Sequence, residues 1–209
     1  MIAKLKKIRD LKNDEDGIAS VELVLSVPIL VWALLSTHVY FDAFKAESLN
    51  TRANLTIADM YSREAVVGSA YVSGTYSLLS ALTAANTVPS LRVTSYLFDA
   101  GDPTDPDDDE YIVIWSEAHG SKYEPFPRDS SLSEIAHKLP VIADNSTSLL
   151  IETNRPYVAP FSIGIGPFIP TDLEGVEFNN FTAIRPRFEG EVCFQDAMGN
   201  SRCADDVVH

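Results

Sequence analysis

The sequence has few of the residues that most enzymatic and metal sites require. It contains only two cysteines, Cys193 and Cys203, and four histidines that are scattered along the chain. It has no G-x-S-x-G, H-E-x-x-H or C-x-x-C motif and no phosphate-binding glycine-rich loop. Two cysteines without neighbouring histidines are a poor supply of ligands for zinc. We therefore expect neither an enzyme nor a bound cofactor.

Basic residues are also scarce, because 16 Lys and Arg against 30 Asp and Glu give a net charge of −14. An acidic surface repels the phosphates of nucleic acid, so we expect no nucleic-acid binding. Clustered carboxylates suit hard cations, which makes one acidic loop a weak calcium candidate. Its carboxylates are Asp102, Asp105, Asp107 and Asp109. The EF-hand spacing fails, since no glycine stands sixth from Asp102 and two prolines interrupt the run, so we expect a solvated loop.

One long stretch is almost free of charge. Residues 18–41 contain a single carboxylate, Glu22. As a helix they would extend roughly 36 Å, enough to cross a bilayer core of about 30 Å. Lysines and arginines precede the stretch, so residues 1–17 are expected in the cytoplasm and the C-terminal domain outside. A secretory signal peptide fits less well, because the apolar stretch exceeds the usual length of about 7–15 residues and no A-x-A site follows.

Glu22 is costly inside such a segment unless it is paired or lies near an interface. In an uncleaved chain it can stay hydrated at the cytoplasmic interface. Cleavage after Gly17 would instead make Ile18 the N-terminus, with an amine one helical turn from Glu22. That amine, or the amine of a neighbouring subunit, would neutralise the carboxylate within an apolar assembly. Pro28 removes one helical hydrogen bond and predicts a kink.

The junction of Gly17, Ile18 and Glu22, with a charged leader before it and a hydrophobic helix after it, resembles the processing site of type IV prepilins. The longer segment DEDGIASVELVLSVPIL resembles the opening of TadE/TadF-like pseudopilins, the minor subunits of tight-adherence (Flp) pili. In these proteins a proline follows the Val-Glu pair, here Pro28. The sequence departs from major Flp pilins at Leu23, where those usually place an aromatic residue. The resemblance is strongest over residues 14–65.

This resemblance implies that a prepilin peptidase cuts after Gly17 at the bacterial inner membrane and that Glu22 helps to align subunits. The implied partners are other pilins or pseudopilins and the inner-membrane assembly platform. The C-terminal domain would then lie in the periplasm or enter the extracellular pilus, acting in assembly, tip structure or adhesion. The alternative is an uncleaved single-pass membrane protein with an extracytoplasmic sensing or binding domain.

The chain beyond the apolar stretch predicts an α+β domain. Residues 42–65 contain no proline or glycine and continue the helix with an amphipathic pattern. A second helix is expected over residues 76–85 and a short one over 130–139, where Ser131 and Glu134 would form a capping box. Strands are expected over residues 91–98, 111–118, 148–153 and 176–188. The expected fold is pilin-like, with the long helix packed on a small antiparallel sheet.

The two cysteines stand close together near the C-terminus, separated by a turn at Met198, Gly199 and Asn200. Outside the membrane, in an oxidising compartment, this arrangement favours a disulfide over free thiols. Closing a loop of this size would contribute roughly 2–3 kcal/mol to stability. The pair also resembles the C-terminal disulfide loop of many type IV pilins.

Overall fold

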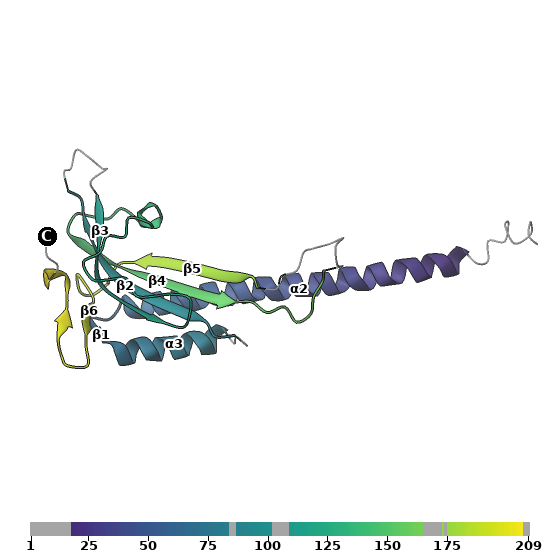
Figure 1. Cartoon of the computed structure of the whole chain (residues 1–209), viewed down its shortest axis with the longest axis horizontal. Helices are drawn as coiled ribbons and strands as arrows, with labels where there is room; N and C mark the ends of the chain where they lie inside the picture. The colour runs from purple at the N-terminus through teal and green to yellow at the C-terminus, as the bar shows by residue number, and fades with distance from the viewer. Residues whose placement is uncertain (1–17, 84–86, 102–108, 165–172, 174, 207–209) are drawn as a thin grey trace, which may run out of the picture. The chain divides into compact units, whose positions relative to one another are not determined.

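The computed structural model describes residues 18–83, 87–101, 109–164, 173 and 175–206 (Figure 1). It divides into two compact units, one formed by Met1–Asp42 with Ala159–Asp172 and one by Ala43–Val158 with Leu173–His209. The helix α2 (Ile18–Tyr61) contributes to both units. The predicted α+β class, with one long N-terminal helix and a small antiparallel sheet, is confirmed.

The second half of α2 packs its small side chains into the core of the second unit. Its buried residues recur every three or four positions, as an amphipathic helix requires; they are Ala43, Ala46, Asn50, Ala53, Asn54, Ile57, Ala58 and Tyr61. The helix ends at Tyr61, four residues before the predicted end at Ala65. Ala65 instead accepts a hydrogen bond of 2.9 Å from the backbone N–H of Cys193. The chain leaves the helix early because the residues after it join a second sheet.

The main sheet has four antiparallel strands in the order β3-β2-β4-β5. Its strands are β2 (Ser90–Asp99), β3 (Glu110–His119), β4 (Ser146–Pro156) and β5 (Glu177–Ile184). All four were predicted, and β2 and β3 form the expected pair on either side of the acidic loop. β5 is shorter than predicted. Beyond it the N–H of Arg187 donates to the carbonyl of Ser62, the residue that follows α2.

Each face of this sheet carries a separate hydrophobic core. One core packs the sheet against α2 and the helix α3 (Ser69–Thr83), through residues such as Ile57, Leu79 and Ile151. The other packs the opposite face against the segment around Leu132 and Leu139. Helix α3 begins seven residues earlier than predicted, and Gly74 lies within it. Residues 84–86, at its predicted end, lie outside the described residues.

The helix predicted over residues 130–139 is wrong. Only a 3-10 turn at Ala136–Lys138 is present there. The preceding backbone pairs with the edge of β3 instead, because the N–H of Val113 donates to Ser130 and the N–H of Leu132 donates to Tyr111. Since those backbone groups are already paired across strands, Ser131 and Glu134 have no helix N-terminus to cap.

A second, smaller sheet has the order β1-β6-β7 and was not predicted. β1 (Val66–Gly68) runs parallel to β6 (Cys193–Gln195), which forms an antiparallel hairpin with β7 (Ser201–Arg202). Trp115 fixes this sheet to the main one, because its indole Nε1–H donates to the carbonyl of Val192 over 2.7 Å. Its ring also packs on Phe194, with centroids 5.5 Å apart.

Candidate membrane and assembly segment

The predicted processing site lies where helix α2 begins. Gly17 is outside the described residues, and Ile18 is the first residue of the helix. Glu22 follows one turn later and is exposed. Helical geometry therefore puts Glu22 about 6 Å along the axis from Ile18. This spacing allows a carboxylate and an N-terminal amine to meet, whether within one chain or between chains.

The first half of α2 exposes a nearly continuous apolar surface. The helix is long and apolar enough to cross a membrane: its most apolar stretch has a mean hydropathy of 1.8 and buries none of its residues within the protein. Its exposed large side chains include Val21, Leu23, Val24, Leu25, Ile29, Leu30 and Leu34. The helix is continuous through Pro28, and the kink stays a prediction. Such a surface is stable only against lipid or other apolar protein.

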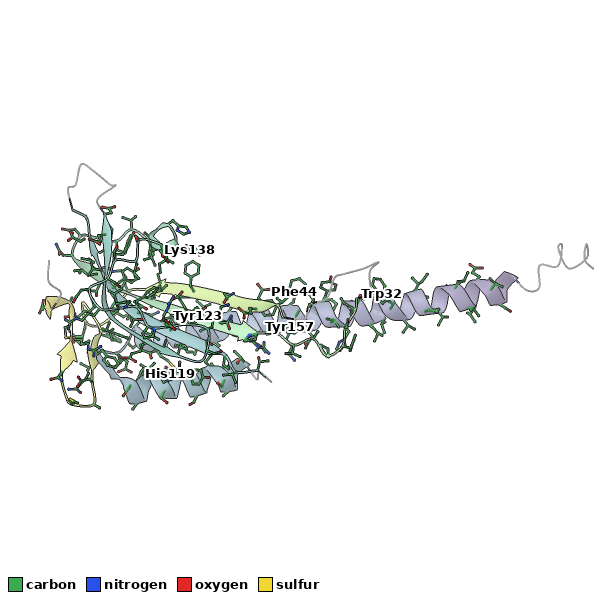
Figure 2. The ribbon with its side chains drawn as sticks, viewed as in Figure 1. Trp32, Phe44, His119, Tyr123, Lys138 and Tyr157 are labelled. Atoms are coloured by element: carbon green, nitrogen blue, oxygen red, sulfur yellow. A yellow bond between two sulfur atoms is a disulfide. The ribbon has the colours of Figure 1, made fainter. Side chains whose placement is uncertain are left out.

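Residues 159–164 lie against the C-terminal part of this apolar stretch, at Trp32 and His38. The indole Nε1–H of Trp32, labelled in Figure 2, donates to the carbonyl of Ile163 over 3.0 Å. The ring of His38 stacks on Phe161, with centroids 6.1 Å apart. Both helix residues belong to the same compact unit as the segment that they contact. This contact was not predicted from the sequence.

The predicted disulfide between Cys193 and Cys203 is confirmed. It joins the start of β6 to the residue after β7, and so closes the C-terminal hairpin. Glu191 lies close to both sulfurs, and its carboxylate accepts the N–H of Ala204. These three residues are the only close grouping of possible metal ligands in the described part of the chain. Because both sulfurs are in the disulfide, no thiolate is available there to bind a metal.

Most of the carboxylates of the calcium candidate lie outside the part of the chain that the structure describes. Of its four carboxylates, Asp102, Asp105 and Asp107 lie outside the described residues. Asp109 directly precedes β3 and is partly buried. It belongs to no grouping of possible metal ligands among the described residues. The solvated acidic loop therefore stays a prediction.

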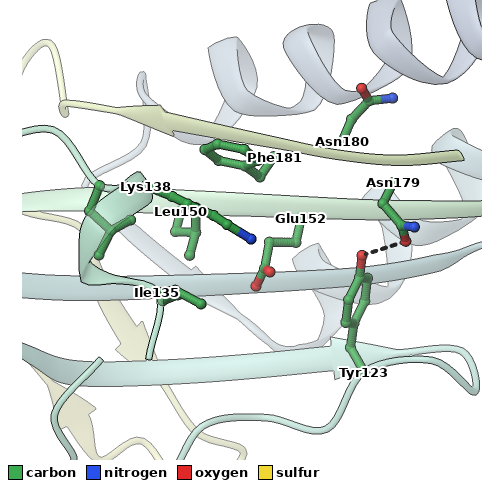
Figure 3. Close-up of a pocket in the computed structure, with 9 residues that line it drawn as sticks. Tyr123, Ile135, Lys138, Leu150, Glu152, Asn179, Asn180 and Phe181 are labelled. Carbon is green, nitrogen blue, oxygen red and sulfur yellow. Dashed lines mark hydrogen bonds between the residues drawn. The ribbon is translucent and has the colours of Figure 1, made fainter. Parts of the chain in front are cut away.

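One pocket of about 120 Å³ lies on the face of the main sheet that carries the second core (Figure 3). Lys138 and Glu152 both point into it, and Leu139, Leu150 and Phe181 form apolar walls. The volume is well below the roughly 300–1,000 Å³ of typical small-molecule sites. The pocket therefore has room only for a small group.

Glu152, one of the two charged residues that line this pocket, is engaged in holding the fold. Arg92 forms an ion pair of 2.6 Å with Glu152, and both side chains are nearly buried. The guanidinium also lies over the rings of Tyr123 and Phe126, 5.0 and 3.8 Å from their centroids. Burial, and next the carboxylate of Glu152, raise the pKa of Tyr123 to about 12. The neutral phenol donates to Asn179 over 3.4 Å. This arrangement stabilises the sheet and offers no activated nucleophile.

Three features of the described structure went undetected in the sequence. Trp115 has the sequence pattern of an ordinary strand residue. Its hydrogen bond to Val192 was missed because the two positions are 77 residues apart. β1 is too short to give a strand pattern of its own. Residues 159–164 did carry a signal, because the sequence from 159 to 171 is free of charge in an otherwise acidic domain.

Comparison with known proteins adds no assignment. No family model matches the sequence, and no curated protein and no solved structure matches it significantly. The resemblance to TadE/TadF-like pseudopilins therefore rests on the residues quoted above. Of these, Glu22 and Pro28 lie on the exposed half of α2.

Proposed function

We propose that this protein is a minor pilin-like subunit of a tight-adherence pilus, anchored in the bacterial inner membrane before assembly. Prepilin peptidase would remove residues 1–17 on the cytoplasmic side. The exposed half of α2 would hold the subunit in the bilayer and later pack among the helices of other pilins. The C-terminal domain would lie in the periplasm, and could pass into the extracellular pilus with the helix.

The observation that carries this proposal is the division of α2 into two halves. Its first half exposes bulky apolar side chains such as Leu25 and Leu34, whereas its second half buries small ones such as Ala53 and Ala58. One continuous helix thus serves as an anchor at one end and as a core element at the other. A helical pilus subunit needs both properties, because the anchor must leave lipid and enter a protein bundle without unfolding the domain.

The position of Glu22 supports the same proposal. It is the one carboxylate in residues 18–41, and it lies one turn from the helix start. In lipid, an unpaired carboxylate is costly. A free amine at Ile18 on an adjacent subunit would pair with it, and this pairing would fix the axial register of neighbouring helices.

The mature N-terminus tests the proposal most directly. The full-length protein is expressed in a host with a prepilin peptidase, and intact-mass spectrometry determines where the chain begins. We expect a start at Ile18, loss of cleavage in Gly17→Val, and normal cleavage in Leu11→Val, a matched change within the leader. A wild-type chain that keeps residues 1–17 in the presence of active peptidase would favour the uncleaved single-pass alternative.

Glu22→Gln separates assembly from processing. The substitution keeps the size of the side chain and removes its charge, so we expect cleavage and membrane insertion to persist. Incorporation into sheared pilus fractions should fall, because the amine of a neighbouring subunit loses its partner. Equal incorporation of Glu22→Gln and wild type would contradict the alignment role.

A further inference from the structure

Residues 159–164, here called the strap, run along the outer part of the apolar stretch of α2. The strap makes two specific contacts with the helix, through the Trp32 indole to the Ile163 carbonyl and through the stacked rings of His38 and Phe161. Ile163 is buried, with 4% of its surface exposed. Trp32 shares a helix face with the buried residues Ser36 and Val39. The strap is therefore a fixed part of the unit that contains the apolar helix.

Both helix residues that contact the strap, Trp32 and His38, lie within the apolar run of α2. This run extends over residues 23–41, between Glu22 and Asp42. Its helical length is about 28 Å, close to the thickness of a bilayer core of about 30 Å. His38 and Trp32 lie roughly 5 and 14 Å before the end of the run along the helix axis. The strap lies beside helix residues that belong to this run. A bilayer that surrounds the run therefore also contacts the strap.

The chemistry of the strap suits that position. It contains no charged residue, and Pro160 has no backbone N–H to satisfy. Irregular backbone near lipid needs internal partners for its polar groups. The carbonyl of Ile163 has one in Trp32, and the N–H of Gly164 donates to the hydroxyl of Ser162 over 3.4 Å. Phe161 stacks on His38 near the end of the run, and aromatic residues favour the boundary between headgroups and acyl chains.

We propose that the strap is a lipid-contacting surface that inserts into the outer leaflet beside α2, from the headgroup–acyl boundary near His38 down to the level of Trp32. The protein would then hold the membrane through two chain segments, the helix and the strap. Because the strap is uncharged and the protein has a net charge of −14, apolar contact drives the insertion and anionic lipid is not required. The inference rests on the membrane anchor in the proposed function, but it needs neither cleavage after Gly17 nor a pilus.

The test uses the full-length protein in phosphatidylcholine liposomes, with a fluorescent label on a single introduced thiol. Both native cysteines are in the disulfide, so the label reacts only with the new cysteine. Ser162→Cys reports on the strap, Leu30→Cys on the exposed face of α2, and Ser73→Cys on the exposed surface of α3. Quenching is compared between nitroxide-bearing lipid, which reaches labels in the bilayer, and iodide, which reaches labels in water.

We expect the Ser162→Cys label to emit at shorter wavelength and to be quenched by nitroxide lipid, as the Leu30→Cys label is, while iodide quenches the Ser73→Cys label. Equal iodide quenching at positions 162 and 73, with Leu30→Cys protected, would overturn the strap proposal and leave the anchor intact. Iodide quenching at position 30 would overturn the anchor, and the strap contact with it.

A second variant tests the tie between helix and strap. Trp32→Phe keeps an aromatic ring and removes the N–H that Ile163 accepts, so the fraction of detached straps should rise roughly fivefold, as the loss of one hydrogen bond implies. Iodide quenching of the Ser162→Cys label should increase accordingly. Leu34→Phe is the matched control, because Leu34 is 71% exposed. Identical quenching in the two variants would contradict the role of the indole.

Discussion

Replacing Gly120 by alanine is expected to destabilise the domain strongly. Gly120 follows β3 directly and has a φ of +97°, in the region that L-amino acids rarely adopt. A Cβ atom there would lie 2.5 Å from the hydroxyl of Ser90, 2.7 Å from the carbonyl of Pro89 and 2.8 Å from the Cα of Ser90. Two of these three atoms belong to the backbone, so rotating a side chain does not relieve the clash.

The expected magnitude follows from two separate costs. The left-handed conformation costs about 1–2 kcal/mol for a residue with a Cβ. Forcing a methyl group into occupied space adds about 1–3 kcal/mol. The sum, roughly 2–5 kcal/mol, is a large part of the 5–15 kcal/mol or so that stabilises a typical domain. Gly74 is the matched control, because it lies within α3 and a Cβ there would meet nothing within 4 Å. Gly74→Ala should stabilise by about 0.5–1 kcal/mol.

Urea unfolding of the full-length protein in detergent measures both effects. Tryptophan fluorescence reports the transition, because one of the two tryptophans, Trp115, is buried between the two sheets. We expect a lower urea midpoint for Gly120→Ala and a higher one for Gly74→Ala, both with an unchanged slope. Ser90→Ala should not rescue Gly120→Ala, since the Ser90 hydroxyl also accepts the N–H groups of Ser121 and Lys122. A Gly120→Ala midpoint at the wild-type value would refute the reasoning.

Three further measurements address other contacts. Replacing both cysteines by serine should lower the free energy of unfolding by about 2.7 kcal/mol for a sequence separation of 10, and an unchanged urea midpoint would show that β1 alone holds the hairpin. Arg92→Met should destabilise the domain by about 3 kcal/mol, because it leaves the nearly buried Glu152 without its partner. Adding Glu152→Leu should recover most of this loss. An additive double-mutant cycle would contradict the coupling between the two residues. Hydrogen bonds from the side chain and then the backbone N–H of Asn200 hold the pKa of Asp196 below its usual 3.8, so this contribution is present above that pH and is lost as the pH falls through the lowered pKa. The protection factor of the Asn200 amide should therefore fall as the Asp196 carboxylate is protonated in acid, and a protection factor that stays constant through that protonation would exclude the effect.

Local patterns predicted the parts of the fold whose partners lie nearby in sequence. β2 and β3 are runs of β-branched and aromatic residues around one loop, so their pairing follows from short-range order. The disulfide likewise joins residues only 10 positions apart. At the site, the apolar run and Glu22 were visible directly, because both depend on composition and helical spacing alone.

Distant partners decided the elements that local patterns missed. Ser131 and Glu134 have the spacing of a capping box, yet the backbone at Ser130 is paired with Val113 of β3. That pairing satisfies several backbone groups at once, and so it outweighs one capping bond. β1 forms only because β6, more than a hundred residues later, supplies its partner. The contact of the strap with Trp32 spans 131 positions, and the charge-free sequence of the strap does not indicate which segment it contacts.

The two asparagines in the second half of α2 show how the domain is held at one register on this helix. Asn50 donates to the carbonyl of Phe178 over 3.0 Å, and Asn54 donates to the carbonyl of Ile151 over 3.1 Å. Arg155 adds a hydrogen bond of 2.7 Å to the carbonyl of Ala46. Each of these groups would lose its partner if the helix moved by one turn, and an unpaired buried polar group costs about 1–3 kcal/mol. An apolar interface would resist such a slip much less, because similar side chains recur every turn. The polar contacts therefore hold the domain at one register on α2. In the proposed function, that register would leave residues 23–41 as the length available to the bilayer or to a helical assembly.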